Sequence, residues 1–119
     1  MIVRAPENKK LVGKTIFLAG PIQGASNWQE EAINIIQSIN KNINIASPRR
    51  NILDKKELSE QNYNEQVDWE TKHLNLAAKN GVIIFWLANE FEKISGRAYA
   101  QTSRFELGEW KIKHERDKI

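Results

Sequence analysis

The apolar run from Val82 to Leu87 constrains the fold of this chain more than any other stretch. It follows Asn80-Gly81 and precedes a long polar loop, Ala88–Gln101. A short unbroken apolar run between turn signals is typical of a buried strand. Because successive side chains of a strand point to opposite faces, this strand is apolar on both faces. We therefore expect it at the centre of a parallel sheet.

Two shorter apolar runs also predict strands, and both end in a turn. They are Thr15–Ala19, closed by Gly20-Pro21, and Ile43–Ala46, closed by Ser47-Pro48. Residues 1–13 are mostly polar and predict a lead-in without a strand.

Two segments carry apolar residues at helical spacing. The first predicts a helix that starts at Ser26, with Gln29 in a capping box. The second predicts a helix that ends at Asn80, where Gly81 suits the left-handed position that follows many helices. The apolar positions that define the buried faces are Trp28, Ala32, Ile35, Ile36 and Ile39 in the first helix, and Tyr63, Val67, Leu74 and Ala77 in the second.

The alternation of strands and helices predicts a single α/β domain over the 119 residues. Right-handed crossovers then make the sheet parallel and cover it on both faces. The loops that follow the strands meet at one edge of such a sheet, which is where open α/β sheets bind ligands. Residues 20–24 supply a glycine-rich loop, residues 47–51 a doubly basic one, and residues 88–106 an acidic one.

Composition excludes several classes of function. The absence of cysteine excludes disulfides, thiol catalysis and cysteine-bound zinc, and it fits a cytoplasmic protein. His73 and His114 are far apart in sequence and are expected to face solvent, so we expect no metal site and no cofactor. The sequence has no apolar run long enough for a membrane span and no secretory segment at residues 1–10. A net charge of +3 is modest, and no nucleic-acid-binding motif is visible.

The glycine-rich and basic loops each have two interpretations. Gly20, Pro21, Ile22, Gln23 and Gly24 lead into a helix, whose amides and dipole suit an anion, but a tight turn explains the same residues. Arg49 and Arg50 suit a phosphate, and a solvated pair after a proline is the simpler alternative.

The start of the last helix carries the main catalytic candidate. This helix is predicted to begin at Thr102 or Ser103, which makes Ser103 and Glu106 a capping box. The alternative is that Glu106 is a nucleophile or a base, with Ser103 among the substrate-binding residues.

Further candidates lie on the preceding helix and strand. Paired carboxylates split glycosidic bonds, and Asp68 and Glu70 are candidates for the second carboxylate. Trp86, Tyr99 and Trp69 are candidates for stacking on a nucleobase, although core packing is the first explanation of Trp86.

Together these segments resemble the nucleoside 2-deoxyribosyltransferase-like family. No single segment is specific, and the resemblance rests on their order and spacing over residues 15–110. The segments are Phe17–Gly24, Ser47–Arg50, Val67–Glu70 with Leu74 and Ala77, Gly81–Leu87, and Phe105–Gly108.

The resemblance implies a flavodoxin-like, Rossmann-like three-layer fold and cleavage or transfer at the N-glycosidic bond of a 2′-deoxynucleoside or its 5′-monophosphate. It implies that Glu106 is the nucleophile and carries the deoxyribosyl group. It assigns base protonation to Asp68, with Glu70 as the alternative. It also implies that the loop at residues 20–24 contacts sugar or phosphate, where Gln23 is a poorer phosphate ligand than a basic residue.

The resemblance leaves three points open. Relatives continue into another strand where this chain ends in a helix, so a complete sheet and a sheet without its last edge strand are both compatible with the sequence. Relatives commonly complete their sites across a dimer, which implies a homodimer or higher homo-oligomer. A non-catalytic nucleotide-binding or sensing module is the alternative to an enzyme, and a basic domain for nucleic acid is a weaker third hypothesis.

Overall fold

A computed structural model describes residues 1–22, 25–50, 60–87 and 101–117. The chain forms two compact units. Unit 1 contains Met1–Leu18 and Gln29–Ile84, and unit 2 contains Ala19–Trp28 and Phe85–Ile119.

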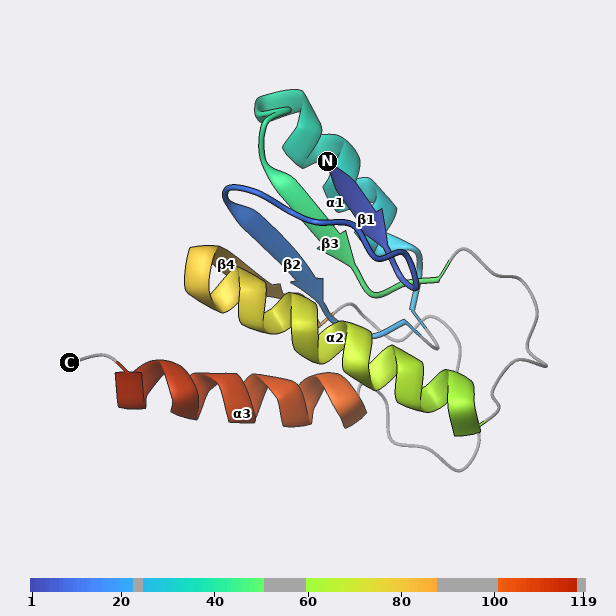
Figure 1. Cartoon of the computed structure of the whole chain (residues 1–119), viewed down its shortest axis with the longest axis vertical. Coiled ribbons are helices and arrows are strands. Elements are labelled where there is room, and N and C mark those ends of the chain that lie inside the picture. Colours follow the sequence, from blue (N-terminus) through green and yellow to red (C-terminus); the bar gives the residue numbers. More distant parts are fainter. Residues whose placement is uncertain (23–24, 51–59, 88–100, 118–119) are drawn as a thin grey trace. The chain divides into compact units, whose positions relative to one another are not determined.

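The described residues form a parallel sheet of four strands (Figure 1). The strands are β1 (Ile2–Arg4), β2 (Thr15–Ala19), β3 (Asn44–Ser47) and β4 (Gly81–Phe85), in the order β1-β3-β2-β4. Both β1 and β2 pair with β3 in parallel. The parallel α/β sheet predicted from the alternating pattern is therefore confirmed.

Strand β1 falls within the stretch that the sequence predicted to be a lead-in, so that prediction is wrong. Ile2 pairs with Ile45 and Val3 with Ala46, and the side chain of Val3 is fully buried. The strand is too short to show a period of its own. Its conformation is stabilised by pairing with β3, some forty residues further along the chain.

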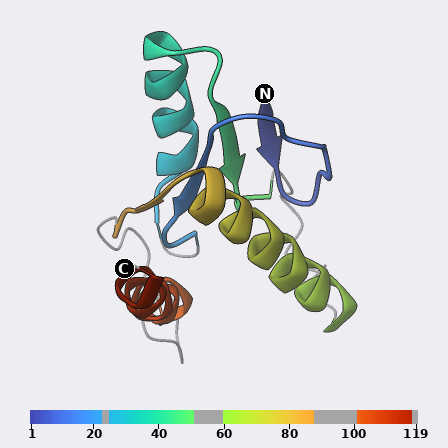
Figure 2. The ribbon, with the colours of Figure 1, turned by 60° about the vertical axis from the view of Figure 1, so that its left-hand side comes forward.

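Helices α1 (Trp28–Ile39) and α2 (Glu60–Asn80) lie on opposite faces of the sheet (Figures 1 and 2). The crossover from β2 to β3 and the crossover from β3 to β4 run in opposite directions across the sheet. Two right-handed crossovers of opposite direction must place their helices on opposite faces. This doubly wound, flavodoxin-like arrangement is the predicted three-layer fold. The third helix, α3 (Gln101–Asp117), belongs to unit 2.

The buried faces of α1 and α2 differ from the predicted ones. In α1, Ile35 and Ile39 are exposed, and the sheet side is occupied by Ile33 and the polar Gln29. In α2, Val67 is 41% exposed. The four isoleucines of α1 allow more than one choice of buried helix face, and tertiary contacts decide which face is buried. The buried α2 residues are Trp69, His73, Leu74 and Ala77.

Among the strands that the structure describes, β4 stands at the edge of the sheet rather than at the predicted centre. Val82 is 49% exposed, as a residue at the edge of a sheet can be. The apolar run was correctly assigned to a strand. Its composition does not reveal how many neighbours the strand has, so its position in the sheet was wrong.

Gly81 is required by close packing, and the predicted left-handed conformation is absent. The described glycine with a left-handed φ is Gly13, at +97°. A Cβ atom at Gly81 would lie 1.8 Å from the carbonyl oxygen of Thr15. The first residue of β4 therefore touches the backbone of β2, and any side chain would push these strands apart.

We expect Gly81→Ala to lower the free energy of unfolding by about 1–3 kcal/mol, because the added methyl group overpacks a backbone contact. The matched control is Gly108→Ala in α3, since a Cβ atom there meets nothing within 4 Å. Alanine in a helix is favoured over glycine by roughly 0.5–1 kcal/mol, so the control should be neutral or stabilising. Urea denaturation of both variants measures the difference, and equal stability would contradict the assigned role of Gly81.

Candidate functional site

Unit 2 contains the turn that follows β2, and this turn is fixed from two sides. The backbone N–H of Trp86, just after β4, donates to the carbonyl of Ala19 at 2.9 Å. The indole Nε1–H of Trp28 donates to the carbonyl of Pro21 at 3.0 Å. A Cβ atom at Gly20 would lie 2.3 Å from the carbonyl oxygen of Trp86 and 2.4 Å from the Trp28 ring. Glycine is therefore required at position 20 for the turn to pass between them.

The start of α1 differs from the predicted capping box. The helix begins at Trp28, whose N–H donates to the carbonyl of Ser26 at 2.8 Å. Gln29 is fully buried, and its side-chain oxygen accepts a hydrogen bond from Arg49. The side chain of Gln29 is thus turned toward the end of β3 and away from the N-terminus of α1. Ile22 is half-buried, whereas Gln23 and Gly24 lie outside the described residues.

The second part of unit 2 is the segment after β4 together with α3. The side chain of Trp86 is 57% exposed. Helix α3 begins at Gln101, so Ser103 is its third residue and Glu106 its sixth. The predicted capping box is therefore wrong, because Ser103 lies within the helix. The side chains of Ser103 and Glu106 lie outside the described residues, and their roles stay predictions.

Several of the described side chains of α3 are charged and exposed. Lys113 forms an ion pair with Glu109 at 2.8 Å, one helical turn away. Its ammonium group also lies 4.3 Å from the centre of the Trp110 ring. These are contacts within one exposed helix face and stabilise it only modestly.

The residues that follow β3 belong to unit 1. Because side chains alternate along a strand, the register of the strands decides on which face of the sheet each of their side chains lies. The register pairs Arg4 with Ser47 and Phe17 with Ala46. Phe17 lies on the α2 side, where its ring is 6.1 Å from that of Trp69. Because side chains alternate along a strand, Ser47 and Arg4 point to the α1 side.

The α1 side holds a group of polar residues, Arg4, Gln29, Glu30, Ser47 and Arg49, called here the polar cluster. Arg4 binds both carboxylate oxygens of Glu30, with Nε at 2.5 Å and Nη2 at 2.9 Å. The Nε–H of Arg49 donates to Gln29 Oε1 at 2.9 Å. Three separate segments therefore contribute to the cluster: the end of β1, the first turn of α1 and the exit of β3.

Charge and burial shape this cluster. The hydrogen bond and charge of Arg4 hold the pKa of Glu30 below its usual value, so Glu30 is an anion. Burial lowers the pKa of Arg49, and the charge of Glu30 offsets part of that effect. Gln29 and Ser47 are buried, with 0% and 1% exposure. Gln29 Nε2 and Ser47 Oγ have no hydrogen-bond partner in the described part of the chain.

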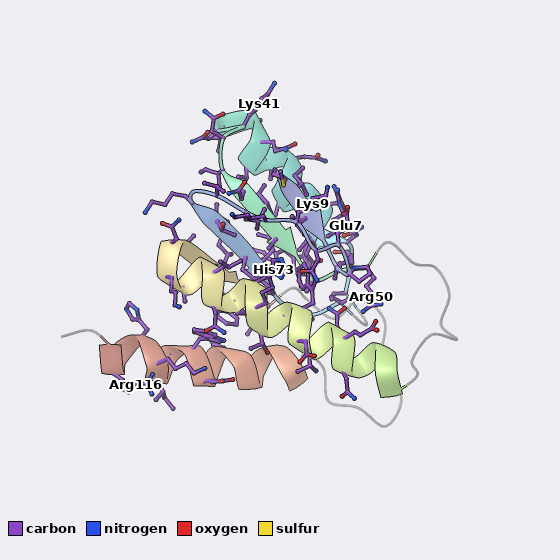
Figure 3. All side chains as sticks on the ribbon, viewed as in Figure 1. Glu7, Lys9, Lys41, Arg50, His73 and Arg116 are labelled. Atoms are coloured by element: carbon purple, nitrogen blue, oxygen red, sulfur yellow. The ribbon has the colours of Figure 1, made fainter. Side chains whose placement is uncertain are left out.

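On the opposite side, Arg50 is held by α2. Its Nε–H donates to Gln66 Oε1 at 2.6 Å, and Gln66 Nε2 donates to the carbonyl of Pro48 at 3.0 Å. One glutamine from each helix thus holds one of the two consecutive arginines. Figure 3 shows Arg50 at the same end of the sheet as Glu7, and Lys41 at the opposite end.

The candidates on α2 occupy different environments. Asp68 is exposed and Glu70 is half-buried. Trp69 is 4% exposed, and its Nε1–H donates to the carbonyl of Glu7 at 2.7 Å. Its ring stacks on His73 with 4.0 Å between centroids. These contacts place the Trp69 indole in the core of unit 1, and its stacking on a nucleobase stays a prediction.

His73 is buried, so the prediction that it faces solvent is wrong. Its Nδ1 lies 2.7 Å from the carbonyl oxygen of Trp69 and therefore carries the proton. Burial is the largest effect on its pKa, which lies below the usual value, and the charge of Lys72 lowers it further. The stacked partner supplies the apolar surroundings that keep this imidazole neutral. Figure 3 shows His73 between α2 and the sheet.

Sequence reasoning missed the polar cluster, although all of its members except Arg4 lie in or beside a predicted element. Arg4 and Glu30 are 26 residues apart, and Gln29 and Arg49 are 20 apart. Neither pair has a local spacing that would reveal it. The detectable signal was a glutamine on the predicted helix next to apolar residues, and it was assigned to a capping box.

The family comparison agrees with this architecture. The model of the family described as "Nucleoside 2-deoxyribosyltransferase like" matches residues 13–118, and the chain belongs to this family. A search of the curated proteins found no match. None of the described helices is long and apolar enough to cross a membrane. The described residues contain no group of three or more His, Asp or Glu side chains that could hold a metal ion.

The buried neutral His73 predicts a loss of stability in mild acid. Above the unfolded pKa, near 6.5, the imidazole is neutral in both states, so its full contribution is present there. As the pH falls toward the lower folded pKa, the unfolded chain takes up a proton that the native state resists. Stability should therefore fall from pH 7 to pH 5, with a slope of up to about 1.4 kcal/mol per pH unit.

Urea denaturation between pH 5 and pH 7 checks this. His73→Phe keeps an aromatic ring against Trp69, and the free energy of unfolding of this variant should vary less between pH 5 and pH 7. His114→Gln is the matched control, because His114 is exposed on α3 and its variant should keep the wild-type slope. If the stability of His73→Phe fell with pH as steeply as that of the wild type, His73 would not be the source of the pH dependence.

Proposed function

We propose that this protein cleaves or transfers the N-glycosidic bond of a 2′-deoxynucleoside or its 5′-monophosphate, with Glu106 as the nucleophile. The observation that carries the proposal is the family match over residues 13–118, which includes Glu106. The doubly wound sheet supports it, because such sheets bind ligands outside the carboxyl ends of their strands at a switch point. Here β2 and β4 are adjacent, and the two crossovers run in opposite directions across the sheet, so the switch point lies between β2 and β4. Helix α3, which carries Glu106, follows β4 in the sequence.

The proposed reaction has two steps. The carboxylate of Glu106 attacks C1′ of the sugar, the C1′–N bond breaks, and a deoxyribosyl ester forms. The base leaves with a proton from a second carboxyl group, assigned to Asp68 with Glu70 as the alternative. Water or a second base then attacks C1′, its proton returns to the second carboxylate, and Glu106 is released. This route gives hydrolysis with water and transfer with a second base.

The described residues of the turn after β2 support substrate binding in this scheme. Glycine at position 20 lets the backbone pass close to Trp86, and two hydrogen bonds hold the turn in place. A fixed turn costs less conformational entropy when a substrate binds. The 57% exposed indole of Trp86 supplies a surface on which a nucleobase can stack.

Glu106→Gln should abolish base release, because an amide cannot act as the nucleophile. We expect a loss of about 1,000-fold or more. The matched control is Glu109→Gln, one turn further along α3, where the carboxylate pairs with Lys113. Incubation with each deoxynucleoside and its 5′-monophosphate, followed by chromatography for free base, measures the rate. Unchanged base release by Glu106→Gln would refute the assignment, and nucleotide binding without base release by the wild type would indicate a sensing module.

The identity of the proton donor is tested separately. Asp68→Asn should lower base release by about 100-fold or more, while Glu70→Gln should change it little. The effect should be largest for bases that leave poorly without protonation. Glu65→Gln, an exposed carboxylate on the same helix, is the control. A loss confined to Glu70→Gln would move the role to that residue.

A further inference from the structure

The end of unit 1 at which its strands β2, β3 and β4 begin, called here the amino edge, is basic. It consists of the residues that lead into β2, the end of α1 with the turn into β3, and the end of α2 with the start of β4. These segments, residues 12–15, 36–45 and 75–84, contain three lysines and no Asp or Glu. The lysines are Lys14, Lys41 and Lys79. All three side chains are exposed.

Hydrogen bonds hold the three segments of the amino edge together. The backbone N–H of Asn44, the first residue of β3, donates to the carbonyl of Lys14 at 3.0 Å. The side chain of Asn80, at the end of α2, donates to the carbonyl of Gly13 at 2.9 Å. Lys41 lies in the turn that leads into β3, and Figure 3 shows it at this end of the unit. The three lysines therefore share one continuous edge.

The charge of these lysines is not neutralised within the described part of the chain, where none of them belongs to an ion pair. The acidic residues that the structure places in unit 1 lie in the turn after β1, the first turn of α1 and the first half of α2. They are Glu7, Glu30, Glu31, Glu60, Glu65, Asp68 and Glu70. Because both helices run against the strands, these positions lie toward the carboxyl ends of the strands. Unit 1 is thus electrically polarised, with its amino edge positive.

Apolar side chains stand beside the lysines on this edge. Val12 and Ile39 are each 80% exposed, the highest value among the large apolar residues that the structure describes. Val12 lies two residues before Lys14, and Ile39 lies two residues before Lys41. The carbonyl of Val12 accepts a hydrogen bond from the side chain of Asn44 at 2.8 Å, which fixes the loop against the start of β3. Each of these two lysines therefore has an exposed apolar neighbour.

Helix dipoles explain only part of this arrangement. Lys79 lies in the last turn of α2, where a cation is favourable. Lys14 precedes a strand, so no helix end accounts for it, and no dipole accounts for the exposure of Val12 and Ile39. Isolated exposed apolar residues are common, but here they accompany a concentration of one charge. The combination indicates a surface that contacts something negatively charged and partly apolar.

We infer that the amino edge of unit 1 docks on an anionic lipid surface, with the three lysines at the headgroups and Val12 and Ile39 entering between them. Lysines beside a membrane bind anionic headgroups, and apolar side chains beside them enter the boundary between headgroups and acyl chains. Nucleic acid is the less suitable polyanion, because its binding sites rely on arginine and aromatic side chains, and the three segments contain neither. In this orientation the carboxyl ends of the strands face away from the lipid.

Co-sedimentation of the full chain with vesicles tests the inference. The protein should bind vesicles of phosphatidylserine and phosphatidylcholine in equal parts and not bind vesicles of phosphatidylcholine alone. Raising KCl from about 0.1 M to about 1 M should release it, because the Debye length falls from roughly 10 Å to roughly 3 Å. Lys14→Gln, Lys41→Gln and Lys79→Gln should each weaken binding roughly fivefold. The pair Val12→Ser and Ile39→Ser should weaken it about tenfold.

Matched controls separate this edge from general effects of charge and apolar surface. Lys9→Gln makes the same charge change beside Glu7, with which Lys9 pairs, and Val67→Ser removes an exposed valine from the acidic half of α2. Both should keep the wild-type affinity for the vesicles. Failure of the wild type to bind phosphatidylserine overturns the inference. A loss in Lys9→Gln as large as that in Lys41→Gln also overturns it, because net charge alone would then explain the binding.

Two further measurements complete the test. The edge variants should keep the wild-type Tm, because the replaced side chains are exposed, so weaker binding cannot come from unfolding. Tighter binding of a DNA duplex than of the vesicles, with no effect of Val12→Ser and Ile39→Ser, would assign the edge to nucleic acid and overturn the lipid surface. The inference does not rest on the proposed reaction: Glu106→Gln should bind vesicles like the wild type, so the two can fail independently.

Discussion

The pairing of β2 with β4 depends on two glycines, one near each end of the contact. Gly81 lets the start of β4 approach the backbone of Thr15, and Gly20 lets the chain leave β2 beside the carbonyl of Trp86. A methyl group at either position would enter space occupied by backbone, which cannot move aside as a flexible side chain can. The adjacency of β2 and β4 in the sheet depends on these close contacts.

The exit of β3 is held in a different way, by polar side chains from both layers of helices. Gln29 of α1 binds Arg49, and Gln66 of α2 binds Arg50. Burying a glutamine and part of a guanidinium gives up hydration that an apolar pair would not lose. What the protein gains is a defined direction for each arginine, since directional hydrogen bonds fix an orientation that hydrophobic packing leaves variable.

The sequence was sufficient for most elements and for the parallel sheet, because apolar periods and turn residues are local signals. It failed where the deciding contact is distant. Strand β1 forms through pairing with β3, and His73 is buried through its place against the sheet and Trp69. For the site, the glycine-proline turn and the two arginines stood out by residue type alone. The burial of Gln29 and Ser47 depends on contacts between segments that are distant in the sequence, and no spacing in the sequence encodes it.

Helix α2 ends at Asn80 and β4 begins at Gly81, so no loop separates them. The rotation of the helix about its axis therefore sets the direction in which the first side chain of the strand points. An extra residue at this junction would turn the entire strand over, because its side chains alternate between faces. On the helix side of this boundary, the exposed Asn80 should thus tolerate substitution far better than a change in length, in contrast to most connections in α/β proteins.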